Sequence, residues 1–88
     1  MKPMVNAKES YKNMTLDQLA SVIRMDWVRM YFGAVPYLCA MESLDNIENK
    51  YGLDSGKSIV AYFLSNAQTW RGDTAREVKA ELNRRLKD

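Results

Sequence analysis

The segment SNAQTWRGDTAREVK, residues 65–79, holds the side chains best suited to bind an anion. Trp70 offers an aromatic plane for stacking, and Arg71 offers a planar group of N–H donors that matches phosphate or carboxylate oxygens. Gly72 lets a ligand approach the backbone just before a predicted helix that starts at Asp73, and helix N-termini favour anions. These residue types predict a site for a phosphate, a nucleotide or a partner carboxylate.

Further basic side chains extend this candidate site. Arg76 and Lys79 add positive charge one turn further on, and Lys57 begins another predicted helix within YGLDSGKS, residues 51–58. That stretch is not a nucleotide-binding P-loop, because the motif G-x-x-x-x-G-K-[ST] requires glycine at the position of Tyr51. The candidate binding residues are Trp70, Arg71, Gly72, Arg76, Lys79 and Lys57.

The same segment also has a purely structural explanation. Trp70 could close one end of a helical core, Arg71 could pair with a carboxylate of the second predicted helix, and Gly72 could make the turn. The sequence leaves both interpretations open.

Catalysis has little support in the composition. The chain has no histidine and one cysteine, Cys39, so it lacks the usual Ser-His-Asp and Cys-His arrangements and the ligands of a histidine or thiolate metal site. Glu42, Asp45 and Glu48 recur every three residues, a spacing typical of a solvated helix face. We expect no enzymatic activity, no metal and no cofactor.

The hydrophobic pattern predicts an all-α fold, a compact four-helix domain with a flexible N-terminal arm. Thr15 and Gln18 form a capping-box sequence at the start of the first helix, and Pro36 suits the first turn of the second. No segment alternates apolar and polar residues over a strand's length, and no hairpin dipeptide such as Asn-Gly occurs, so no strand is expected. The expected helices span about 15–32, 36–51, 55–70 and 73–86.

Helical periodicity also predicts which side chains form the core. The expected inward residues of the four helices are Leu16, Leu19, Ile23 and Trp27; Leu38, Met41, Leu44 or Asp45, Glu48 and Tyr51, with Ala40 and Ile47 beside them; Val60, Phe63, Leu64 and Ala67, flanked by Ile59 and Tyr62; and Ala75, Val78, Leu82 and Leu86.

Length and charge restrict the class of protein. Eighty-eight residues make one domain, expected at 15–88 behind an arm at 1–14. Thirteen Lys plus Arg against eleven Asp plus Glu is too even for a polybasic nucleic-acid binder. The longest apolar run, eight residues, is too short to span a bilayer, and the N-terminus does not resemble a signal peptide, so we expect a soluble cytoplasmic protein.

Large apolar side chains are abundant for so short a chain, with five tyrosines, two tryptophans and six methionines. Interfaces favour aromatic residues and methionine. In the first predicted helix, Val22, Met25, Val28 and Phe32 lie outside the inward stripe. A helix that is apolar on more than one side is usually covered by a partner, so we expect self-association with this helix near the interface.

The segments VPYLCAMESLDNI and YGLDSGKSIVAYFLSNAQTWRGDTAREVKAEL resemble small accessory proteins encoded by bacteriophages and prophages. The resemblance covers most of residues 15–86. It implies action inside a bacterial host cell, by blocking a defence protein, sequestering a defence signal or redirecting host machinery. It assigns no role to any residue.

Two functions follow as expectations. The first is a non-catalytic binding protein that neutralises a bacterial host or defence component, by blocking a protein or by sequestering a nucleotide second messenger. The alternative is a small DNA- or RNA-binding regulator that uses the basic side chains of the last helix. Glu77, Glu81 and Asp88 interrupt those side chains, which disfavours nucleic acid.

Overall fold

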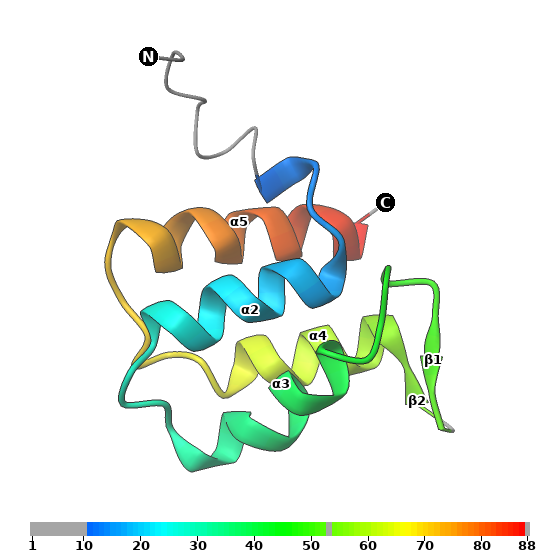
Figure 1. Ribbon diagram of the computed structural model, residues 1–88, viewed down its shortest axis with the longest axis horizontal. Helices are drawn as coiled ribbons and strands as arrows, with labels where there is room; N and C mark the ends of the chain where they lie inside the picture. The colour runs from blue at the N-terminus through cyan, green and yellow to red at the C-terminus, as the bar shows by residue number, and fades with distance from the viewer. Residues whose placement is uncertain (1–10, 53, 88) are drawn as a thin grey trace.

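The computed structural model describes residues 11–52 and 54–87 and shows a mostly helical domain with a small two-stranded sheet (Figure 1). The helices and strands are α2 (Leu16–Asp26), the 3-10 helix η1 (Phe32–Ala34), α3 (Val35–Met41), β1 (Lys50–Tyr51), β2 (Asp54–Ser55), α4 (Gly56–Ser65) and α5 (Asp73–Lys87).

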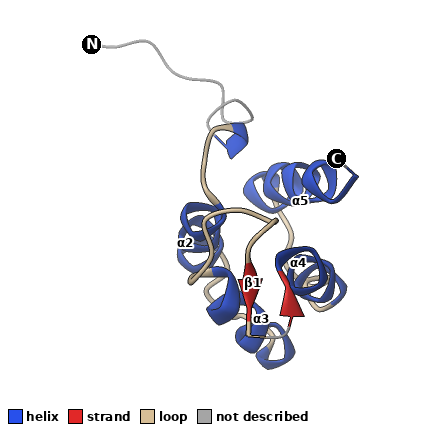
Figure 2. Ribbon diagram, turned by 90° about the vertical axis from the view of Figure 1, so that its right-hand side faces the viewer, coloured by secondary structure: helices blue, strands red, loops and turns tan. Residues whose placement is uncertain are grey.

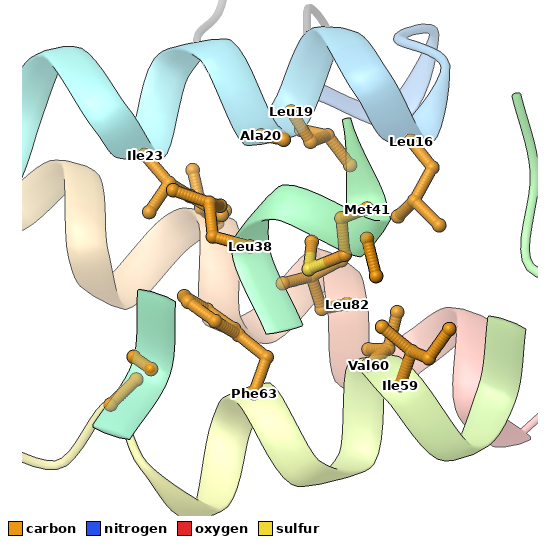
Figure 3. Close-up of a cluster of buried hydrophobic side chains, with 14 of the residues drawn as sticks. Leu16, Leu19, Ala20, Ile23, Leu38, Met41, Ile59, Val60, Phe63 and Leu82 are labelled. Atoms are coloured by element: carbon orange, nitrogen blue, oxygen red, sulfur yellow. The ribbon is translucent and has the colours of Figure 1, made fainter. Parts of the chain in front are cut away.

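The helices enclose one hydrophobic core. α2 packs against α3 and α5, and α4 packs against the same two helices. Figure 2 views the arrangement from the end that carries the two strands. Side chains from α2, α3, α4 and α5 meet in the core, as the close-up in Figure 3 shows. Most of the inward positions predicted from the sequence are confirmed, although Leu64 and Leu86 are only partly buried. In the second predicted helix, Asp45, Glu48 and Tyr51 are exposed, so that part of the prediction is wrong.

The expectation of a purely all-α fold is wrong at residues 50–55. Lys50 pairs with Ser55 and Tyr51 pairs with Asp54 in an antiparallel hairpin. Gly52 has a φ of 63°, which glycine adopts without steric cost and which tight hairpin turns require. The prediction of a helix over 36–51 did not consider that Gly52 can also be the first position of a two-residue hairpin turn.

The second helix is much shorter than predicted, because α3 ends at Met41. The Asn49 side-chain oxygen accepts hydrogen bonds from the backbone N–H groups of Asp45 and Asn46, each at 3.0 Å. The Asn46 side chain accepts another from the N–H of Glu48 at 2.8 Å. Such side-chain acceptors compete with the helical carbonyls for backbone donors, and here they replace the helix by turns.

The first predicted helix is also too long, because α2 ends at Asp26. Its start is confirmed, since the N–H of Thr15 donates to Oε1 of Gln18 at 2.9 Å. At Trp27 the backbone leaves the helical region, with φ −94° and ψ 77°. The chain then turns into η1, so Val28 and Phe32 do not belong to the helix.

The third helix begins near the predicted position but ends early. The hydroxyl oxygen of Ser55 accepts a hydrogen bond from the N–H of Ser58 at 3.1 Å, and α4 ends at Ser65 rather than near Trp70. Gly56 lies tightly against the preceding loop, because a Cβ there would come within 2.6 Å of the Ile47 carbonyl oxygen. α5 begins at Asp73, where the fourth helix was expected.

Part of the predicted arm contacts the domain. Arg85 donates hydrogen bonds to the carbonyl oxygens of Tyr11 at 3.0 Å and Met14 at 2.7 Å. Residues 1–10 of the predicted flexible arm lie outside the described part of the chain. None of the described helices is long and apolar enough to cross a membrane.

Candidate functional site

Two connections that are far apart in the sequence meet at one end of the molecule, on the left of Figure 1. One follows α2 and the other joins α4 to α5. Trp27 and Trp70 stack there, with ring centroids 5.8 Å apart and planes inclined by 16°. We call this region, residues 25–32 and 65–76 together with the Lys79 side chain, the tryptophan end.

Trp70 does not offer the open stacking plane that the sequence suggested. Its side chain is 2% exposed, and its indole Nε1 donates a hydrogen bond to Oδ2 of Asp26 at 2.8 Å. The Trp27 ring lies parallel to it, and the edge of Phe63 packs at a centroid distance of 6.4 Å. For this residue the structural explanation is correct: Trp70 closes one end of the core.

The residues around Trp70 nevertheless gather as predicted. A hollow of about 310 Å³ is lined by Trp70, Arg71, Gly72, Ala75, Arg76 and Lys79, which include every candidate residue except Lys57. Lys57 lies in the first turn of α4, beside the hairpin at the opposite end of the molecule (Figures 1 and 2). The fold therefore separates Lys57 from the other candidates.

The Lys79 side chain lines the hollow and is held in position by its contacts with Trp70. Its ammonium donates to the carbonyl oxygen of Trp70 at 2.6 Å and lies 5.8 Å from the centre of the Trp70 ring. Partial burial lowers the pKa of Lys79, and the positive charge of Arg71 lowers it further. The side chain is therefore a positioned cation in an environment that already carries excess positive charge.

The two arginines of the hollow differ in their partners. Arg76 forms an exposed ion pair with Asp73, with Nη2 and Oδ1 2.6 Å apart. Arg71 is exposed and forms no hydrogen bond or ion pair with any described residue. The structural explanation paired Arg71 with a carboxylate of the second predicted helix, but no described carboxylate pairs with it, and Glu42 pairs with Arg24 at 2.7 Å. The Arg71 guanidinium thus keeps its donors available to a ligand.

Gly72 lies where the chain enters α5. Its φ of 116° suits glycine, and a Cβ there would meet no atom within 4 Å. Its carbonyl oxygen accepts the N–H of Arg76 at 2.9 Å, while the earlier N–H groups of a helix lack an intrahelical acceptor. These N–H groups and the helix dipole add to the positive potential of the hollow.

Three apolar side chains at this end were missing from the predicted site. Val28, Met25 and Phe32 are 85%, 82% and 79% exposed, the highest values among the large apolar residues described. The signal was present in the sequence as apolar residues outside the inward stripe of the first helix. We attributed it to self-association and did not connect it to Arg71.

Other hollows flank the same region. One of about 330 Å³ lies between the two connections, and one of about 300 Å³ lies beside α2 and α5. The first is lined by Tyr31, Ser65, Asn66, Gln68 and Thr69, and the second by Tyr11, Val22, Met25, Asp26 and Thr74. The tryptophan end therefore carries several hollows whose linings mix polar and apolar side chains.

The described residues offer no metal site. Within residues 11–52 and 54–87, no group of three His, Cys, Asp or Glu side chains could hold a metal ion. No family model, curated protein or solved structure matches the chain. Its function must therefore be inferred from the exposed arginines and apolar side chains themselves.

Proposed function

We propose that this chain is a non-catalytic binding protein that neutralises a bacterial host or defence component by blocking a protein surface. The observation that carries the proposal is the exposure of Met25, Val28 and Phe32 at the tryptophan end, which also carries the exposed Arg71. Apolar side chains of this size are costly to leave in water, and Met, Phe and Arg are enriched at protein interfaces.

Sequestration of a nucleotide second messenger has less support than protein blockade. A nucleobase would need an aromatic plane, and the Trp70 ring is already covered by Trp27 and Lys79. Arg71 could still hold a phosphate, but the base would have to stack elsewhere. We therefore favour a macromolecular target.

Nucleic acid is a weaker candidate for that target. In α5, the carboxylate of Glu81 accepts hydrogen bonds from both Arg84 and Arg85, at 2.6 Å each. These arginines are therefore engaged within the protein, and fewer cations remain to follow a phosphate backbone. A DNA or RNA interface would also leave the exposed apolar side chains without a matching surface.

The bacterial setting rests on the resemblance of residues 15–86 to phage and prophage accessory proteins. Such a protein would act in the host cytoplasm, where occupation of a functional surface is enough to inactivate a defence protein. Two properties then follow: the target is a discrete protein, and inhibition requires one bound molecule per target site.

A photo-reactive amino acid at position 32, in protein expressed in bacterial cells, tests the first property. We expect a cross-link to one discrete host protein. The matched control is position 51, because Tyr51 is also aromatic and exposed but lies in the hairpin at the opposite end. Equal cross-linking from both positions, or cross-linking only to nucleic acid, would contradict the proposal.

Titration of the purified target with this protein tests the second property. A blocking protein should abolish target activity at a stoichiometric end point, and Phe32→Ser should raise the amount required at least about tenfold, since hot-spot truncations cost 2 kcal/mol or more. Complete inactivation at a small fraction of equivalence would instead reveal an enzyme.

A further inference from the structure

The charge distribution of the tryptophan end defines the chemistry of its partner, and the inference rests on the proposed function. The two carboxylates of this end are both engaged, Asp26 by the Trp70 indole and Asp73 by Arg76. Arg29 and Arg71 are exposed and form no ion pair with any described residue. The surface therefore presents uncompensated positive charge.

Lys79 strengthens this imbalance. It lies close enough to Arg71 for the two positive charges to repel, and its ammonium is held by the Trp70 carbonyl rather than by a carboxylate. A negative group placed against Arg71 would relieve the repulsion and gain charge-assisted hydrogen bonds.

The apolar side chains decide which class of anionic partner fits. Val28 adjoins Arg29 in the same connection, and Phe32 packs against Tyr31 with ring centroids 5.0 Å apart. Because Trp27 stacks on Trp70, the segment with Val28 and Arg29 lies near the segment with Arg71. The tryptophan end thus presents both large apolar groups and guanidinium groups. Protein interfaces have this composition, whereas nucleic-acid interfaces are more polar and more uniformly basic.

A second copy of the chain does not provide the missing charge. In a two-fold dimer through the tryptophan end, each residue would face residues of the same surface. Arg29 and Arg71 of one copy would then lie near those of the other, and such like-charge contacts are unfavourable. An acidic partner has no such penalty.

We propose that the tryptophan end binds an acidic segment of a partner protein, whose carboxylates pair with Arg29 and Arg71 while its apolar side chains cover Val28 and Phe32. Pairing of Arg with a carboxylate is bidentate in favourable geometry, so the arginines fix orientation as well as charge. The apolar contact excludes water from these pairs and strengthens them.

Binding of defined probes tests the assignment without knowledge of the natural target. The first probe is a short peptide of aspartate, glutamate and leucine, the second is the same peptide with asparagine and glutamine in place of the acids, and the third is single-stranded DNA of equal charge. Binding is followed by amide chemical shifts of the labelled full chain. We expect the acidic peptide to shift amides of residues 28–32 and 71–79 and to bind at least about tenfold more tightly than either other probe.

Charge reversal identifies the contacts. Arg71→Glu and Arg29→Glu should each weaken binding of the acidic peptide at least about tenfold without lowering the unfolding midpoint, because neither side chain forms an ion pair with any residue that the structure describes. The matched control is Lys50→Glu, at an exposed position of the hairpin, which should change the affinity less than about twofold because of its distance. Phe32→Ser should also weaken the peptide.

Several results would overturn the inference: no binding of the acidic peptide, shifts confined to other residues, tighter binding of the DNA, or equal loss with Lys50→Glu. A dimer that Phe32→Ser abolishes would assign the surface to a second copy. The proposed function fails separately, if position 32 cross-links to no discrete protein. A cross-linked target that tolerates Arg29→Glu and Arg71→Glu would reject only the acidic-partner inference.

Discussion

At the scale of single residues, the bond between Trp70 and Asp26 decides how the tryptophan end is built. The indole N–H is buried with the ring, and Asp26 accepts its hydrogen bond at 2.8 Å. Removal of the acceptor would leave a buried donor unpaired, whereas a truncated surface carboxylate would change little. Trp70, which the sequence suggested as a stacking plane for a ligand, therefore closes the end of the core.

We predict that Asp26→Ala lowers the free energy of unfolding by about 1 to 3 kcal/mol, the cost of an unsatisfied buried donor. Asp26→Asn should cost less, because its amide oxygen can still accept the bond. Asp45→Ala, at an exposed carboxylate, is the control and should stay within about 0.5 kcal/mol of the wild type. Urea denaturation followed by tryptophan fluorescence measures all three, and a wild-type midpoint for Asp26→Ala would refute the role of this bond.

At the scale of elements, α5 carries a charge cluster that ties the start of the described chain to its last helix. Glu81 is 8% exposed and accepts hydrogen bonds from Arg84 and Arg85, while Arg85 also donates to carbonyl oxygens of residues 11–14. Burial alone would raise the pKa of Glu81, but the hydrogen bonds and charges of Arg84 and Arg85 outweigh it and lower the pKa.

A lowered pKa in the folded state gives stability that is present above the unfolded-state pKa, about 4.3 for Glu, and lost as the pH falls through the folded-state value. We predict that Glu81→Gln destabilises the domain at neutral pH and that its deficit shrinks below about pH 4.3. Thermal unfolding of both proteins across this range measures the effect, with Glu77→Gln on the same helix as the control. A deficit that is constant with pH would show that Glu81 acts through packing rather than charge.

At the scale of the whole molecule, the self-association expected from the sequence stays a prediction. The exposed arginines of the tryptophan end predict how the stability of such a dimer depends on salt. Contact between two tryptophan ends would bring Arg29 and Arg71 of both copies together, so added salt should screen the repulsion and strengthen the dimer. Binding of an acidic partner should weaken under the same change. Sedimentation velocity at low and high salt measures the change in dimer formation. A protein that stays monomeric at both salt concentrations would refute self-association.

Local sequence determined most of the helices and their inward faces. The capping pair Thr15 and Gln18, the cap at Ser55 and the apolar spacing are short-range signals, and each acts through contacts within one or two helical turns. The same signals failed at residues 42–55, where asparagine side chains and Gly52 favour turns and a hairpin over a continued helix. These alternatives differ by only a few hydrogen bonds, so periodicity alone does not separate them.

The sequence by itself determined that Arg71, Gly72, Arg76 and Lys79 would lie near one helix start, because they are neighbours along the chain. Only the tertiary structure decided that Trp70 is buried. Its partners Asp26, which lies 44 residues earlier in the sequence, and Trp27 belong to the end of α2. The same long-range packing placed Lys57, in the first turn of α4, at the opposite end of the molecule and left Val28 and Phe32 exposed. Burial and the joining of distant connections depend on how the whole core closes, which no local pattern of residues specifies.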